Sequence, residues 1–104
     1  MVTIVNIVVA VVRSGTFDKW LTKLRDVRGR ATVLVRIERL AAGNAGDVKP
    51  VGDGVSEMRI AFGPGYRVYF MKPGETLIVL LAGGDKSTQA ADIIKAKAIA
   101  KEWK

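Results

Sequence analysis

The chain has 104 residues, and its 17 Lys and Arg residues against 10 Asp and Glu residues give a net charge of +7. It contains no cysteine and no histidine, which excludes disulfides and histidine-dependent catalysis and removes the usual ligands of zinc. We therefore expect no metal and no cofactor. The positive charge favours a polyanion or an acidic protein as partner, with a basic surface kept for solubility as the alternative. The length fits a single domain, residues 1–104, and the lack of cysteine fits the cytoplasm.

Residues 2–12 are rich in Val and Ile and predict a buried strand. The run is too short to span a bilayer. No basic segment precedes it, as one would in a secretory signal, so we expect no membrane association.

A short helix is predicted after the turn "SGT", with Ser14 or Thr16 as its cap. Four large apolar residues recur there at helical spacing and form one face: Phe17, Trp20, Leu21 and Leu24. That spacing favours Trp20 as a core residue over a role in stacking on a nucleobase.

A second helix is predicted from Asp26 to Ala42, capped by Asp26 and ended by Gly43 and Asn44. Its expected buried stripe consists of Val27, Ala31, Leu34, Leu40 and Ala41, with Ile37 beside it. Residues 18–39 hold seven basic and three acidic residues. This charge is either a solvated surface or one that faces phosphates or a protein partner.

Residues 43–54 are predicted as a loop from their Gly, Asn, Asp and Pro content. Two strands follow within residues 55–70, joined by "GPG", and a third strand covers residues 76–82 after the turn "KPGE". The segment "GGDKS" is expected to break this strand before a last helix from Ser87 to Trp103. The inner face of that helix is marked only loosely, by Ala90, Ile93, Ile94 and Lys97.

The predicted order β-α-α-β-β-β-α indicates an α+β fold in which a small antiparallel sheet packs against helices. Two helices are expected to cover one face of the sheet. The other face is expected to stay partly open, as antiparallel sheets allow.

Strand alternation divides the side chains of the hairpin at 55–70 between two faces. One face is expected to be buried: Ser56, Met58, Ile60, Phe62, Tyr66, Val68 and Phe70. The other, expected to be open, carries Glu57, Arg59, Ala61, Arg67 and Tyr69, with Lys86 and Asp92 nearby. Arg and Lys bind phosphate and stabilise developing negative charge, so this set suits phosphodiester chemistry. Cross-strand pairs that only stabilise the sheet are the alternative.

Several segments together resemble the RelE/ParE superfamily of bacterial toxins, and within it the HigB-like "addiction module killer protein" branch. They are "FDKWL", "LRD", "RIERLAAGNAGDVKPVGDGVSEMRI", "GPGYRVYF" and "LLAGGDKSTQAADIIKAKAIAKEW". The resemblance implies a toxin neutralised by a helix-turn-helix antitoxin. In the RNA-cleaving members the toxin cuts mRNA in the ribosome by attack of the RNA's own 2′-hydroxyl. A gyrase poison that cleaves nothing itself and an inactive interaction module are the alternatives.

The resemblance also implies roles for single residues. Arg67 matches the arginine that contacts the scissile phosphate, and Arg59 and Lys86 match basic residues that bind phosphate or stabilise charge. Tyr69 or Asp92 is expected to position or move the proton, although Asp92 stands where the best-studied relatives have a tyrosine. The residues expected to anchor ribosomal RNA are Lys49, Arg28, Arg36 and Arg39.

Overall fold

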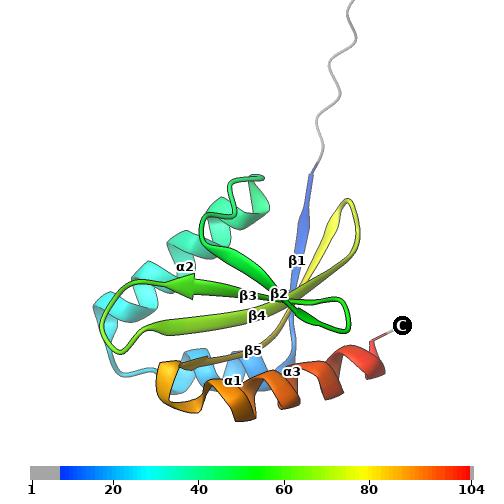
Figure 1. Cartoon of the computed structure of the whole chain (residues 1–104). Coiled ribbons are helices and arrows are strands. Elements are labelled where there is room, and N and C mark those ends of the chain that lie inside the picture. The colour runs from blue at the N-terminus through cyan, green and yellow to red at the C-terminus, as the bar shows by residue number, and fades with distance from the viewer. Residues whose placement is uncertain (1–7, 104) are drawn as a thin grey trace, which may run out of the picture.

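The computed structural model describes residues 8–103, and within them the chain forms a five-stranded sheet and three α-helices (Figure 1). In chain order the elements are β1 (Ala10–Arg13), α1 (Gly15–Lys23), α2 (Val27–Ala41), β2 (Val48–Gly52), β3 (Val55–Ile60), β4 (Tyr66–Gly74), β5 (Leu77–Asp85), the 3₁₀ turn η1 (Lys86–Thr88) and α3 (Gln89–Glu102). The strand order in the sheet is β1-β5-β4-β3-β2. The α+β class predicted from the sequence is confirmed.

The sheet is mixed, and the prediction of a purely antiparallel sheet was wrong at one edge. β2, β3, β4 and β5 are antiparallel neighbours, but β1 pairs with β5 in parallel, from Ala10 opposite Leu77 to Arg13 opposite Leu80. Side-chain alternation does not carry the direction of pairing, which depends on the long connection between the two strands. The N-terminal part of the strand predicted at 2–12 lies outside the described residues.

Residues 43–54, predicted as a loop, contain the edge strand β2. It pairs with β3, Lys49 lies opposite Glu57, and the register shifts between Pro50 and Gly52. Proline is tolerated in an edge strand because only one side of that strand must supply hydrogen bonds. The Pro and Gly content that predicted a loop therefore concealed a strand.

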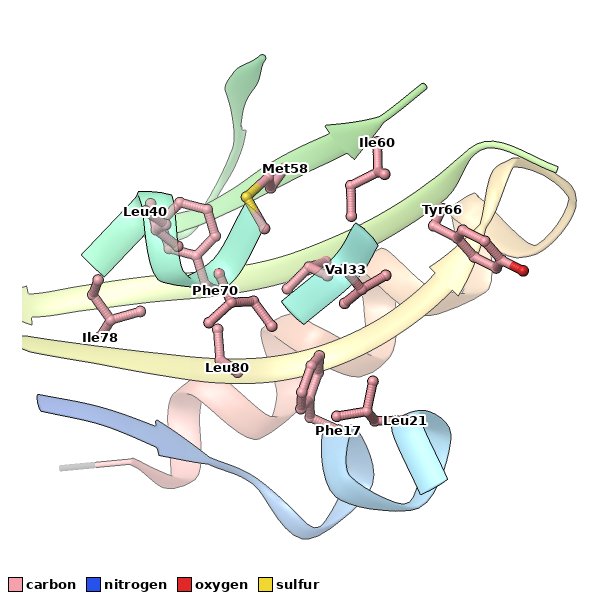
Figure 2. Close-up of a cluster of buried hydrophobic side chains, with 12 residues drawn as sticks. Phe17, Leu21, Val33, Leu40, Met58, Ile60, Tyr66, Phe70, Ile78 and Leu80 are labelled. Atoms are coloured by element: carbon pink, nitrogen blue, oxygen red, sulfur yellow. The ribbon is translucent and has the colours of Figure 1, made fainter. Parts of the chain in front are cut away.

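The larger core lies between the sheet and the helices α1 and α2, as predicted for two helices on one face (Figure 2). Phe17 and Val33 are fully buried there. Trp20 packs against this core, with its ring centroid 5.7 Å from that of Phe17 and 6.2 Å from that of Tyr66. Trp20 packs against the core as predicted, but it is only half-buried, so part of the indole stays exposed.

Side-chain caps begin both of these helices, as predicted. Ser14 Oγ accepts the Phe17 N–H at 3.0 Å, and Asp26 Oδ1 accepts the Gly29 N–H at 2.9 Å. The second carboxylate oxygen of Asp26 accepts the Tyr66 hydroxyl at 2.8 Å, so this cap also joins α2 to β4.

The buried stripe of α2 differs from the predicted one. Gly29, Val33, Ile37 and Leu40 are the buried residues of this helix. Val27 is 71% exposed and Ala31 is exposed as well. Apolar residues occur around much of α2, so their spacing in the sequence did not determine which side of the helix faces the sheet. The bond from Tyr66 to Asp26 and the close approach of the Tyr66 ring to Gly29 do so.

α3 covers the face of the sheet that was expected to be open (Figure 1). A second core lies under it, formed by Val55, Tyr69, Val79, Leu81, Ala82 and Ala96. The open face was a wrong prediction, because β5 is apolar on both sides and such a strand needs cover on both.

The contacts of α3 also differ in detail from those predicted. Its buried residues are Asp92 and Ala96, and Ile93 is half-buried, whereas Ile94 is 71% exposed and Ala90 is exposed. No helix within residues 8–103 is both long enough and apolar enough to cross a bilayer.

Candidate functional site

Arg59 and Arg67 lie directly opposite each other on β3 and β4. Lys86, at the start of η1, lies beside Arg67. A β-carbon placed on Gly65 would be 3.4 Å from Arg67 Nη1 and 3.5 Å from Lys86 Cβ. We call Arg59, Arg67 and Lys86 the cationic row. Like charges facing each other across strands repel, so the arrangement costs stability unless a negative charge compensates.

Glu57 supplies the compensating charge. Its side chain is fully buried, and its carboxylate accepts hydrogen bonds from Arg59 Nε at 3.1 Å, the Tyr69 hydroxyl at 3.1 Å and Gln89 Nε2 at 2.7 Å. Burial favours a higher pKa for Glu57, but these hydrogen bonds and the charge of Arg67 outweigh it and lower the pKa below its usual value. Glu57 is therefore ionised at neutral pH and holds the Arg59 guanidinium against the sheet.

Tyr69 is buried beside Glu57 instead of standing on an open face. It is 0% exposed, and its hydroxyl donates to the Glu57 carboxylate. Burial and the charge of Glu57 raise the pKa of Tyr69 well above its ordinary value. A phenol in this position neither reaches a substrate nor releases its proton at neutral pH. The predicted role of Tyr69 in proton transfer therefore does not fit the structure.

Arg67 is half-buried and is held by backbone groups rather than by a counter-ion. Its Nη1 donates to the carbonyls of Gly65 at 3.0 Å and Tyr66 at 3.3 Å. It forms no ion pair within residues 8–103, and its buried Nε has no hydrogen-bond partner there. Buried donors without a partner are rare in folded proteins. The guanidinium of Arg67 thus carries a charge that the described part of the chain leaves uncompensated by direct contact.

Asp92 lies one strand away from Arg67, above Gly84, which is the cross-strand partner of Arg67. A β-carbon at position 84 would collide with the Asp92 carboxylate, so the strand needs glycine here. Asp92 is 7% exposed and accepts a hydrogen bond from Thr88 Oγ1 at 2.5 Å. The structure therefore brings Asp92 close to the cationic row, as predicted, but in a separate hollow beside β5.

The residues predicted to anchor RNA lie on two elements, Arg28, Arg36 and Arg39 on α2 and Lys49 on β2. Arg28 and Arg39 are exposed on α2, and Lys49 is exposed on the edge strand β2. Arg36 differs, because its Nη1 donates to the Arg59 carbonyl at 2.8 Å and its Nη2 to the Ala45 carbonyl at 3.2 Å. Arg36 thereby fastens α2 to β3 and to the loop after α2, which is a structural role.

Two contributors to the site were not predicted from the sequence. Glu57 is two residues from Arg59 on β3, so the strand pattern predicted correctly that both lie on the same face. The pattern did not predict that Glu57 is buried. Gln89 had no signal at all, because its contact with Glu57 joins residues 32 positions apart. No group of three or more potential metal-ligating side chains comes together in the described part of the chain.

Comparison with known proteins shows the family of the chain. The chain matches the family model "Phage derived protein Gp49-like" over residues 19–104. It is also similar to an uncharacterized protein of Haemophilus influenzae, with 53% identity over 87 residues, which are 84% of this chain and 88% of the relative. The family match spans α2, β2–β5 and α3, and so it includes the whole cationic row and Glu57.

Proposed function

The chain belongs to the Gp49-like phage-derived protein family, and from this membership we propose that it is the toxin of a toxin–antitoxin module. Members of this family are commonly found in such modules. Its target in this proposal is mRNA on the ribosome, which it cleaves so that translation stops. A cognate helix-turn-helix antitoxin neutralises it. The net charge of +7 and the sequence resemblance to RelE/ParE toxins support the proposal.

The observation that carries the nuclease assignment is the unpaired charge of Arg67 within the cationic row. Structural arginines inside a protein are normally paired. Here Arg59 is paired with Glu57, whereas within residues 8–103 Arg67 is held only by carbonyl oxygens, and Lys86 is exposed beside it. Such a row is suited to a phosphate group, which would supply the missing negative charge.

The reaction in this proposal needs no metal. The 2′-hydroxyl of one nucleotide loses its proton to water as its oxygen attacks the adjacent phosphorus. The bond from phosphorus to the 5′-oxygen breaks, and a 2′,3′-cyclic phosphate and a 5′-hydroxyl result. Arg67 and Arg59 stabilise the charge that develops on the phosphoryl oxygens, since fixed donors aimed at developing charge are a major source of catalysis. The ammonium of Lys86 donates a proton to the departing 5′-oxygen.

The remaining basic residues have supporting roles in this proposal. Arg28, Arg39 and Lys49 are exposed and bind ribosomal RNA through its phosphates, so their contribution weakens as salt is added. Tyr69 and Arg36 are left out, because the first is buried and the second is bound to backbone carbonyls. Neutralisation requires that the antitoxin keep RNA away from the cationic row.

A purified translation reaction with a defined mRNA tests the proposal, with cuts mapped by primer extension. We expect cuts within codons in the ribosomal A site that require ribosomes and disappear with Arg67→Ala. Loss of a charge that stabilises the transition state typically costs about 100-fold or more in rate.

Lys101→Ala is the matched control, because it removes a basic residue that lies near the C-terminal end of α3, outside the cationic row. It should cleave as the wild type does. Intact mRNA with the wild-type protein, or full cleavage by Arg67→Ala, would contradict the nuclease assignment. Broken chromosomal DNA together with intact mRNA would point to gyrase as the target.

A further inference from the structure

A hollow of about 530 Å³ is lined by residues of α1, of the end of β5 and of the first turns of α3. β1 pairs with β5 only as far as Leu80, whereas β5 continues to Asp85. The outer edge of β5 therefore has no neighbouring strand along the hollow. The volume lies within the range of small-ligand sites, about 300–1,000 Å³.

The hollow combines an aromatic wall, two carboxylates, Asp85 and Asp92, and three lysines at its rim. Trp20 forms the wall and lies so close to β5 that a β-carbon at Gly83 would collide with the indole. Asp92 lies at the base, packed against Gly84. The rim carries the ammonium groups of Lys19, Lys23 and Lys95. Two successive glycines thus allow an aromatic ring and a carboxylate to approach the same short stretch of strand.

Asp92 has hydrogen-bonding capacity that the described part of the chain does not use. Its Oδ2 accepts from Thr88, and its Oδ1 accepts no hydrogen bond from residues 8–103. The side chain is 7% exposed and lines the hollow. Oδ1 keeps some exposure although the residue as a whole is buried, because it is not among the buried atoms that lack a partner. A carboxylate oxygen can only accept, so an N–H donor in the hollow suits it.

We propose that the hollow binds one nucleotide of RNA, with its base against Trp20 and Asp92 and its phosphate at the lysine rim. The inference rests on the proposed function, since it places part of the RNA substrate. The lysines favour an anion, the indole favours a flat ring, and the Asp92 carboxylate favours N–H groups. A nucleotide meets all three preferences in one molecule.

The same carboxylate favours guanine over uracil. Guanine presents two neighbouring N–H donors, N1–H and the 2-amino group, to a carboxylate. Uracil presents one N–H between two carbonyl oxygens, and these oxygens repel a carboxylate. Sites built around a polar contact discriminate strongly against ligands that leave it unmade.

The position of the hollow agrees with a substrate that continues to the cationic row. Gly84, below Asp92, is the cross-strand partner of Arg67. Neighbouring strands are about 5 Å apart, so the hollow and Arg67 are one strand spacing apart. Adjacent parts of one RNA strand can therefore occupy both.

Tryptophan fluorescence of the full chain tests the inference. The sequence has two tryptophans, so Trp103→Phe leaves Trp20 as the only reporter. GMP, UMP and inorganic phosphate are titrated separately. We expect GMP to quench Trp20 and to bind about tenfold more tightly than UMP, and inorganic phosphate to leave the indole unquenched.

Three variants in the Trp103→Phe background sharpen the test. Asp92→Asn should reduce the preference for GMP over UMP to about threefold or less, because an amide also offers an N–H to the uracil carbonyls. Lys95→Ala should weaken GMP and UMP alike and reduce the salt dependence of both. Lys101→Ala, outside the hollow, should change neither affinity.

Equal binding of GMP and UMP by the unmutated hollow would overturn the inference, as would no quenching at concentrations up to about 10 mM. These outcomes are separate from those of the cleavage reaction. Cleavage of mRNA without nucleotide binding would contradict the proposal that the hollow binds a nucleotide, but it would support the nuclease assignment. GMP binding with intact mRNA would support the hollow as a nucleotide site and remove the nuclease assignment.

Discussion

The two faces of the sheet are stabilised in different ways. The face under α1 and α2 has an apolar core, and its internal polar contact, between Tyr66 and Asp26, lies where α2 begins. The face under α3 has a smaller apolar cluster and, next to it, the ionised Glu57 with its three hydrogen-bond donors. One face is arranged for stability alone. The other gives up apolar contact area to hold opposed arginines, a pattern expected where a fold carries a site.

The largest loss of stability should come from Phe17→Ala, on the face of the sheet that α1 and α2 cover. Phe17 is fully buried, so the substitution should lower the free energy of unfolding by about 3–5 kcal/mol. Urea denaturation measures the change. The nuclease activity per folded molecule should fall far less than with Arg67→Ala at low temperature, because Phe17 does not contact the cationic row and reaches the hollow only through Trp20. A loss of activity in the folded variant as large as that of Arg67→Ala would mean that the two faces are coupled.

Glu57→Gln should have the next largest effect, on the α3 face. The amide keeps the shape of the side chain but leaves Arg59 without its ion-pair partner and removes the charge that acts on Arg67 without touching it. Breaking a buried ion pair costs about 3–5 kcal/mol, and we expect about 2–3 kcal/mol because the Arg59 side chain is 34% exposed and can be solvated.

Urea denaturation and the cleavage reaction are both measured for Glu57→Gln. Cleavage should fall as well, because Arg59 loses its anchor. Met58→Leu is the control, since Met58 is the next residue on β3, faces the other core and changes little in volume. Equal stability of Glu57→Gln and wild type would show that Glu57 does not support the row.

Gln89→Ala removes one of the three hydrogen-bond donors to Glu57 and tests how much α3 contributes to holding the Glu57 carboxylate. Hydrogen bonds to charged groups contribute about 1.5–3 kcal/mol, and we expect the lower end because Arg59 and Tyr69 remain. Thermal unfolding measures the loss. Gln89 lies in the first turn of α3, so hydrogen exchange should also increase there. Unchanged exchange and stability would mean that the bond from Gln89 to Glu57 is not formed in solution.

The smallest expected effect is on the pH dependence of stability, to which Glu57 on one face and Asp26 on the other contribute in different pH ranges. Glu57 and Asp26 both have a lowered pKa in the folded protein, Glu57 through its hydrogen bonds and Asp26 through the Gly29 N–H and the Tyr66 hydroxyl. The stability that each contributes is complete above the pKa of the unfolded chain, 4.5 for Glu57 and 3.8 for Asp26. It is lost as the pH falls through the lower folded value.

Urea denaturation between pH 7 and pH 3 separates the two groups. Glu57→Gln should reduce the loss of stability that begins as the pH falls below about 4.5. Asp26→Asn should reduce the loss that begins below about 3.8. If neither variant changes the slope of stability against pH, neither carboxylate is linked to folding in this way.

Much of the fold could be predicted from the sequence because the local signals agreed with each other. The caps at Ser14 and Asp26, the helical spacing of Phe17 and Leu21, and the alternation in β3 and β4 all depend on residues close together in the chain. The predictions that failed depended on distant partners. Proline at position 50 argued for a loop, and only the position of β2 at the sheet edge explains why a strand tolerates it.

The same distinction holds for the candidate site. Alternation correctly placed Arg59 and Arg67 on one face, and the register confirms that they lie opposite each other. It also placed Tyr69 on that face, but it carried no information about what covers the face. Because α3 lies there, Tyr69 is a buried donor to Glu57 rather than a group that meets substrate.

The sequence by itself determined the element types other than β2, the helix caps, the charge and the set of cationic residues. Each of these follows from residue type and from spacing along a single strand or helix. Only the tertiary structure decided the parallel pairing of β1, the cover supplied by α3, the ionised state of Glu57 and the hollow beside Asp92. These features depend on groups far apart in the chain that meet only after folding, where burial and neighbouring charges set their chemistry.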